Sequence, residues 1–161
     1  MKPKTISSGT LCGLIEAIAE AAINRTARYG TGWLGGLQSP VQVANVIEAV
    51  RKRSTEVGRP LDDDHYGAGL SYRFGSWDDP IVQRTAAGFA RISDAGDPRE
   101  MIAVGDSDAI ITMVQKYIAA GASKFVARPI ANDSSEVFEQ TELLIEEVLP
   151  TIHSTDVEIS T

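Results

Sequence analysis

The sequence AAINRTARYGTGWLGG, Ala21 to Gly36, reads as a helix, a closing glycine, a short strand and two further glycines. Ile23 and Ala27 lie one helical turn apart and give the helix an apolar face. Gly30 is the residue type that commonly ends a helix in the left-handed conformation. The segment Thr31 to Leu34 is short and apolar, which predicts a buried strand. Because another helix is predicted a few residues later, the strand has a helix on each side, as in a parallel α/β sheet.

The rest of the chain continues this alternation. The helix predicted from Ser39 to Val57 has the clearest signals, because Ser39 can cap it, Pro40 suits its first position and Gln42 completes a capping box. Segments that suit strands are Thr5 to Ser8, His65 to Phe74, Met101 to Val104 and Lys124 to Pro129. Three further helices are predicted. One begins at Asp79-Pro80, the next is capped by Ser107, and the last is capped by Ser134 or Ser135 and ends at Pro150. The sequence therefore predicts three or four parallel strands.

Composition restricts the class of protein. The chain has 161 residues, is 43% hydrophobic and carries a formal charge of -7, which suits one domain with one core and argues against a nucleic-acid partner. Cys12 is the single cysteine, and His65 and His153 are the only histidines, so neither a disulfide nor a metal site is predicted. No apolar run reaches the roughly 20 residues that span a bilayer. We expect a cytoplasmic protein without a membrane partner.

Five segments follow one another in a recognisable order. They are AINRTARYGTGW at Ala22 to Trp33, SPVQVANVIEAVRKRSTEVGRP at Ser39 to Pro60, HYGAGLSYRFG at His65 to Gly75, VGDSDAIITMVQKYIAAGASKFVARPI at Val104 to Ile130, and ELLIEEVLP at Glu142 to Pro150. In this order and spacing the chain resembles the C-terminal half of the luciferase-like monooxygenases. These are flavin- or deazaflavin-dependent oxidoreductases that include the bacterial luciferase subunits.

The resemblance implies an α/β fold that is a partial TIM (β/α)8-type barrel with an insertion. Thr31 to Leu34, His65 to Phe74 and Lys124 to Arg128 would be the last three of its eight strands. A complete barrel needs ~250 residues, so the chain is expected to be a fragment of about half a family member. Residues 19–161 would form the C-terminal part of the barrel domain, and residues 1–18 would form an N-terminal segment whose relation to the family stays open.

The resemblance also implies a function. A complete member of the family would be an oxidoreductase that acts on a small organic substrate, using either reduced FMN with oxygen or a deazaflavin, coenzyme F420, as hydride carrier. Much of the catalytic surface would belong to the N-terminal half, so no catalytic residue is predicted. The alternative is a non-catalytic half-barrel that serves as an interaction or self-association module, because its strand edges need cover. The expected partners are accordingly a second copy of the chain or the missing N-terminal half.

Two glycine-containing turns are candidates for the cofactor phosphate. A phosphate binds to backbone N–H groups in a small-residue turn at the start of a helix. Ser8, Gly9 and Thr10 are suitable residue types ahead of a predicted helix, although such a sequence also suits an ordinary turn. Gly35 and Gly36 follow a predicted barrel strand on the catalytic face, with a flexible strand-to-helix turn as the alternative interpretation.

Two arginines are candidates for contact with substrate or phosphate. Arg73 and Arg128 lie near the C-terminal ends of their predicted strands, which is the ligand-binding end of a TIM barrel. For Arg73 the alternative is an ion pair with Asp78 or Asp79, and Arg128 has the same two interpretations. His65 is expected to be a structural histidine, in a hydrogen bond with the acidic turn before it.

Overall fold

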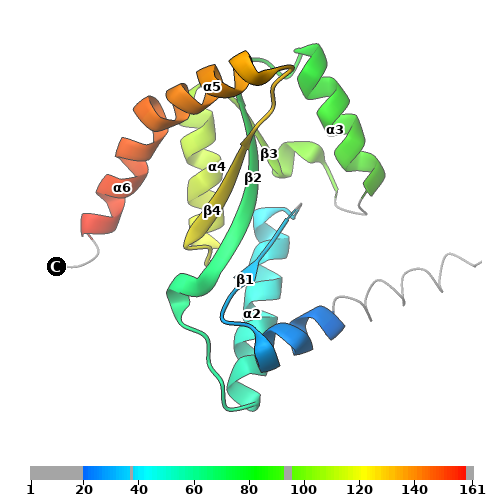
Figure 1. Cartoon of the computed structure of the whole chain (residues 1–161), viewed down its shortest axis with the longest axis vertical. Coiled ribbons are helices and arrows are strands. Elements are labelled where there is room, and N and C mark those ends of the chain that lie inside the picture. Colours follow the sequence, from blue (N-terminus) through cyan, green and yellow to red (C-terminus); the bar gives the residue numbers. More distant parts are fainter. Residues whose placement is uncertain (1–19, 37, 93–95, 159–161) are drawn as a thin grey trace, which may run out of the picture.

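The structure is a computed structural model that describes residues 20–36, 38–92 and 96–158. Its centre is a four-stranded parallel sheet of β1 (Trp33–Leu34), β2 (Tyr66–Phe74), β3 (Ile102–Gly105) and β4 (Lys124–Pro129). The long strand β2 is central (Figure 1). One of its edges pairs with β4, and the other is shared by β1 at its start and β3 at its end. The predicted α/β class with a parallel sheet is confirmed.

Helices alternate with these strands. Residues 20–29 are helical, followed by α2 (Pro40–Glu56), α3 (Pro80–Ile92), α4 (Ser107–Ala119), α5 (Ser134–Leu143), a π-helical turn (Leu144–Val148) and α6 (Leu149–Glu158). Short 3-10 turns lie at Asp63–His65 and Pro98–Glu100. Within the described ranges, no helix has both the length and the apolar character needed to cross a membrane. The predicted strand Thr5 to Ser8 lies outside the described residues.

Helix α2 begins as its sequence predicts. The Ser39 backbone N–H donates to Gln42 Oε1 at 2.9 Å, and the Gln42 N–H donates to Ser39 Oγ at 3.4 Å, which completes the capping box. Pro40 occupies the first helical position, where its missing N–H costs nothing. The inward stripe contains Val43 and Ile47, which are both buried. Local signals alone therefore fix this helix and the face it buries.

The predicted serine caps of two later helices are wrong. Asp106 caps α4 and Asp133 caps α5, and each carboxylate accepts the backbone N–H three residues further along at 3.0 Å. Ser107 and Ser134 are instead the first helical residues. A carboxylate at this position also interacts favourably with the positive end of the helix dipole, which a hydroxyl does much less.

Pro150 does not end the last helix as predicted. The chain passes from α5 through the π-helical turn Leu144–Val148 into α6, and Pro150 lies in the first turn of α6. A proline is tolerated in a first turn, because its N–H would have no partner in the new helix. The π turn resets the hydrogen-bond register, so the helix continues to Glu158.

The two faces of the sheet have different surroundings. Alternate residues of β2, from Tyr66 to Tyr72, point to a face covered by α2 and α4, where they form the main core. A second, smaller cluster joins α3 to the other face of β3, through Val82, Ile102 and Val104. Beyond that cluster no helix of the described residues covers this second face, here called the open face, although the end of β1 lies over Gly67 and Gly69. It carries Leu34, Gly67, Gly69, Ser71, Lys124, Val126 and Arg128.

The sheet does not close on itself. Among the described residues no strand pairs with the outer edge of β4. A parallel sheet with helices on one face fits part of a TIM-type barrel, in which further strands would enclose the other face. The family resemblance implies three barrel strands in this region, which correspond to β1, β2 and β4. The structure also contains β3, which pairs with the same edge of β2 as β1 does.

Candidate functional site

The open face has little side-chain bulk at its centre. Gly67, Gly69 and Ser71 are the residues of β2 that point to it, and each pairs with a residue of β4 that points the same way. The backbone of β1 comes close at this point, and Gly69 donates its N–H to the Gly35 carbonyl oxygen at 2.8 Å. A Cβ atom on Gly69 would lie only 2.6 Å from the Gly36 carbonyl oxygen. Glycine at position 69 is therefore required for the end of β1 to pass over β2.

Gly35 and Gly36 form the bend where β1 leaves the sheet. The Gly35 N–H donates to the Gly67 carbonyl oxygen at 2.9 Å, and the Gly36 N–H donates to Gln38 Oε1 at 3.1 Å. Gly35 is buried, whereas Gly36 is exposed and a Cβ atom there would meet nothing within 4 Å. The strand-to-helix turn weighed in the sequence analysis is present. A rotation of the Gln38 side chain would free the Gly36 N–H for another acceptor without breaking a strand hydrogen bond. The Gly35 N–H, in contrast, is bonded to β2.

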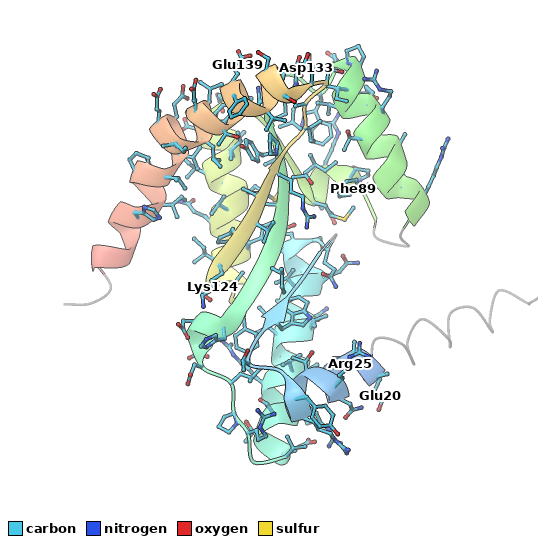
Figure 2. The ribbon with its side chains drawn as sticks, viewed as in Figure 1. Glu20, Arg25, Phe89, Lys124, Asp133 and Glu139 are labelled. Carbon is cyan, nitrogen blue, oxygen red and sulfur yellow. The ribbon has the colours of Figure 1, made fainter. Side chains whose placement is uncertain are left out.

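Basic side chains line the β4 side of the open face. Arg128 is level with Ser71, and Lys124 is level with Gly67 at the other end of the strand. Figure 2 shows Lys124 at the start of β4 and Asp133 beyond its end. Lys124 Nζ lies 3.9 Å from Asp64. The Arg128 side chain is exposed and makes no hydrogen bond or ion pair within the described part of the chain, so its guanidinium is available to an anion.

Arg73 is held by acidic partners. Its Nε donates to Asp79 at 2.9 Å, and its Nη1 donates to Glu136 at 3.2 Å and to the Ile130 carbonyl oxygen at 2.8 Å. Burial opposes the charge of Arg73, but the hydrogen bonds to both carboxylates outweigh burial and raise its pKa. The side chain is 14% exposed. Of the two interpretations of Arg73, the structure contains the ion pair, with Asp79 rather than Asp78 and with Glu136 in addition.

The pKa values of the two acidic partners, Asp79 and Glu136, are both lowered. A hydrogen bond from Arg73 is the main cause that lowers the pKa of Asp79. Glu136 accepts the Asn132 backbone N–H at 2.8 Å, and this bond is the largest cause of its lowered pKa. Arg73 and its two carboxylate partners join the ends of β2 and β4 to α5. Arg73 therefore supports the fold beside the open face.

His65 lies at the entrance to β2, next to an acidic turn. Its Nδ1 is 3.0 Å from Asp64 Oδ1 and 3.8 Å from Asp62 Oδ2, without a hydrogen bond to either. Ligand atoms of these three residues lie within 4.8 Å of one another. Both carboxylates are exposed, and Asp64 also lies near Lys124. The expected structural histidine is beside the acidic turn, but the expected hydrogen bond is not formed.

Gln140 is a structural residue that the sequence analysis missed. Its side-chain amide accepts the Phe74 N–H at 2.7 Å and donates to the Phe74 carbonyl oxygen at 3.1 Å, while Tyr72 Oη donates to its backbone oxygen at 3.3 Å. Gln140 thus continues the β4 side of the ladder after β4 has ended. A glutamine inside a helix gives no sequence signal for such a contact, which joins residues 66 positions apart.

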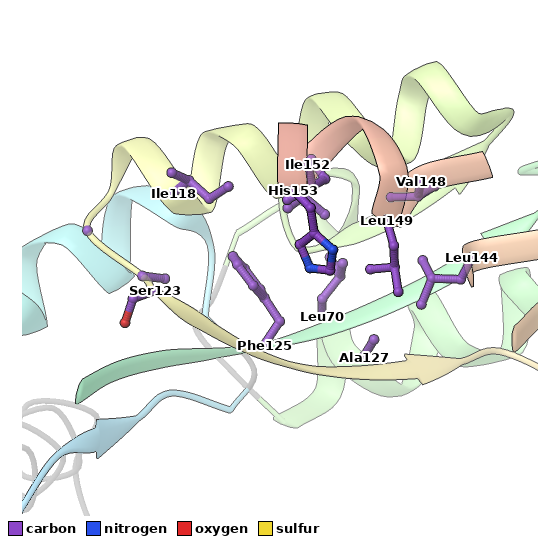
Figure 3. Close-up of a pocket in the computed structure, with 13 residues that line it drawn as sticks. Leu70, Ile118, Ser123, Phe125, Ala127, Leu144, Val148, Leu149, Ile152 and His153 are labelled. Atoms are coloured by element: carbon purple, nitrogen blue, oxygen red, sulfur yellow. The ribbon is translucent and has the colours of Figure 1, made fainter. Parts of the chain in front are cut away.

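A pocket lies on the opposite side of the sheet from the open face. It has a volume of about 570 Å³ and lies between α4 and α6, with β4 as its floor (Figure 3). Its lining is mainly apolar and includes Ile118, Phe125, Ala127 and Ile152. Among the described residues, none of Gly35, Gly36, Arg73 and Arg128 lines it. Ser8, Gly9 and Thr10, the other predicted phosphate turn, lie outside the described residues.

Comparison with known proteins gives matches in structure alone. No family model matches the chain, and no curated protein matches its sequence. One similar solved structure is an F420-dependent secondary alcohol dehydrogenase in complex with an F420-acetone adduct, with 14% identity and a TM-score of 0.63 over 80% of this chain and 45% of that one. Another is the monooxygenase RslO1 from Streptomyces bottropensis, with 15% identity and a TM-score of 0.58 over 82% of this chain and 45% of that one.

A third match is the oxygenating constituent of 3,6-diketocamphane monooxygenase, a type II Baeyer-Villiger monooxygenase from the CAM plasmid of Pseudomonas putida, in complex with FMN. It has 12% identity and a TM-score of 0.56 over 80% of this chain and 44% of that one. At such identities the likeness concerns the fold. The chain shares the fold of one part of these three enzymes, and it spans less than half of their length.

Proposed function

We propose that the chain is the C-terminal part of a luciferase-like oxidoreductase, and that its open face holds the phosphate of FMN or coenzyme F420. The single observation that carries the proposal is the free Arg128 guanidinium, which lies level with Ser71 on the open face of the parallel sheet. Similar solved structures that contain F420 or FMN support the same class of cofactor.

The residues present suit an anionic group. A guanidinium binds a phosphate through two parallel hydrogen bonds, and neither Arg128 nor the Ser71 hydroxyl has another partner within the described residues. Gly69 and Ser71 are about 7 Å apart along β2, so Arg128 lies close to the exposed turn at Gly36. The Gly36 N–H would become a third donor if the Gln38 side chain turned away.

When bound, FMN or F420 would supply the redox chemistry, a hydride transfer or an oxygenation, on a small organic substrate. The residues of this chain would bind and orient the cofactor. Arg128 and Ser71 would hold its phosphate. Leu34 and Val126, which are exposed on the same face, would exclude water from its apolar side.

The experiment that tests this proposal compares FMN with riboflavin, which lacks the phosphate. We expect FMN fluorescence to be quenched by the chain, and riboflavin to bind at least about tenfold more weakly, since a phosphate held by arginine contributes more than 1.4 kcal/mol. The same titration with F420 decides between the two cofactors. Arg128→Ala should weaken FMN binding about tenfold, whereas the matched control Arg91→Ala, an exposed arginine on α3, should leave it unchanged.

Two results would count against the proposal. If neither FMN nor F420 binds to the folded chain, the alternative of a non-catalytic half-barrel is favoured. If riboflavin binds as tightly as FMN, a cofactor site exists, but the phosphate is not the group that Arg128 recognises.

A further inference from the structure

The pocket of Figure 3 is an apolar groove between α4 and α6. Its volume of about 570 Å³ is within the range of ~300–1,000 Å³ that small-molecule sites occupy. Phe125 and Ala127 of β4 form its floor, and its walls include Ile118 on α4 and both Leu149 and Ile152 on α6. Protein cores contain few voids larger than a water molecule, so an apolar hollow of this size is typical of a binding site.

The floor and the α6 wall of the groove are held in place by the core. The Phe125 ring meets the buried Tyr117 ring edge-on, with the two centroids 6.4 Å apart. Val148, which directly precedes α6, is 1% exposed, and Ile152 packs against the main core. The groove is therefore formed without a ligand, and a preformed site does not have to be ordered when a ligand binds.

His153 is the one titratable side chain among the described residues that line the groove. Its ring points from α6 toward the floor (Figure 3), and it makes no hydrogen bond within the described part of the chain. The backbone N–H groups of Gly121, Ala122 and Ser123, at one end of the groove, already donate to carbonyl oxygens at 2.8 to 3.0 Å. An imidazole always carries at least one N–H, so His153 offers a donor to a ligand in the groove.

We propose that this groove is a second binding site, for an aromatic carboxylic acid, and that it shares no residue with the phosphate site proposed on the open face. The aromatic body of the ligand lies on Phe125 and Ala127, because aromatic rings attract one another beyond the burial of their area. Its carboxylate accepts a hydrogen bond from His153, which is exposed at the mouth of the groove. A charge-assisted bond is roughly twice as strong as a neutral one, and no described side chain that lines the groove is acidic.

The test uses three compounds and the 161-residue chain. Naphthoate has both parts of the proposed ligand, naphthalenemethanol has the same rings without the charge, and octanoate has the charge without a ring. Binding is followed by chemical-shift changes of the Ala127 methyl and His153 ring signals. We expect naphthoate to bind more tightly than octanoate and at least about tenfold more tightly than naphthalenemethanol.

Two variants with matched controls make the test specific. His153→Ala should reduce the affinity for naphthoate to about that for naphthalenemethanol, whereas His65→Ala, just before β2, should change neither affinity. Ala127→Phe should block both compounds by filling the floor of the groove. Ala127 is exposed, so the variant should fold like its control Ala87→Phe, which adds the same side chain to the exposed surface of α3, and circular dichroism checks this.

Four results would overturn the proposal. The first is that naphthoate does not bind to the folded chain, and the second is that octanoate or naphthalenemethanol binds as tightly as naphthoate. The third is that His153→Ala keeps the preference for the acid, or that binding survives in Ala127→Phe. The fourth is a mass of twice 17.3 kDa by light scattering that returns to the single-chain mass in Ala127→Phe, because a second copy would then cover the groove.

Discussion

Replacement of Gln140 by leucine tests how the sheet is completed where β4 ends. Gln140 is 5% exposed, and its amide pairs with both backbone groups of Phe74, at 2.7 and 3.1 Å. Leucine has a similar size but satisfies neither group. A buried group left without its partner costs about 1–3 kcal/mol, so the loss of two bonds predicts a decrease of about 2–4 kcal/mol in the free energy of unfolding. The bond from Tyr72 to the Gln140 backbone is retained.

The measurement is chemical denaturation followed by circular dichroism, with the midpoint and slope fitted to a two-state transition. Glu139→Leu is the matched control, because Glu139 is the exposed neighbour on the same helix (Figure 2) and its loss should change stability by less than about 0.5 kcal/mol. A Gln140→Leu protein within about 0.5 kcal/mol of the wild type would refute the reasoning that this amide replaces a strand neighbour of β2.

Three further substitutions test the close approach at Gly69 and the pH dependence of the Arg73 network. Gly69→Ala should destabilise the fold by more than about 1 kcal/mol, because its Cβ would lie 2.6 Å from the Gly36 carbonyl oxygen. Gly36→Ala should be tolerated, because a Cβ there would meet nothing within 4 Å. Equal thermal midpoints for the two variants would contradict the close approach. The pKa of Glu136 is lowered, first by the hydrogen bond from the Asn132 N–H and also by Arg73. The stability that the Glu136 carboxylate contributes is therefore present above its pKa in the unfolded chain, and it is lost as pH falls through its folded-state pKa. Glu136→Gln should therefore flatten the decrease in thermal midpoint on acidification, and an unchanged acid profile would show that the Arg73 network does not contribute.

The parts of the fold that depend on local sequence could be predicted. Ser39, Pro40 and Gln42 fix the start of α2 through contacts within one turn, and the apolar strand segments gave the parallel α/β class. The serine caps were wrong because Asp106 and Asp133 precede them by one residue and offer a charged acceptor. Neighbouring residues of similar capping ability cannot be ranked without knowledge of the backbone.

Contacts between distant segments could not be predicted. The ion pair of Arg73 with Asp79 was one of two open interpretations, since the partners are six residues apart, but Glu136 comes from a helix 63 residues away. Gln140 is equally remote from the strand that it completes. The position of Arg128 near the end of a strand could be predicted, but the absence of an ion pair to it among the described residues depends on the packing of the elements around it.

The most direct measurement of the central claim is a crystal structure of the chain with FMN. The account predicts the phosphate on the open face, with its oxygens about 3 Å from the Arg128 guanidinium and within reach of the Ser71 hydroxyl. A phosphate bound elsewhere, or an FMN molecule in the groove between α4 and α6, would contradict it.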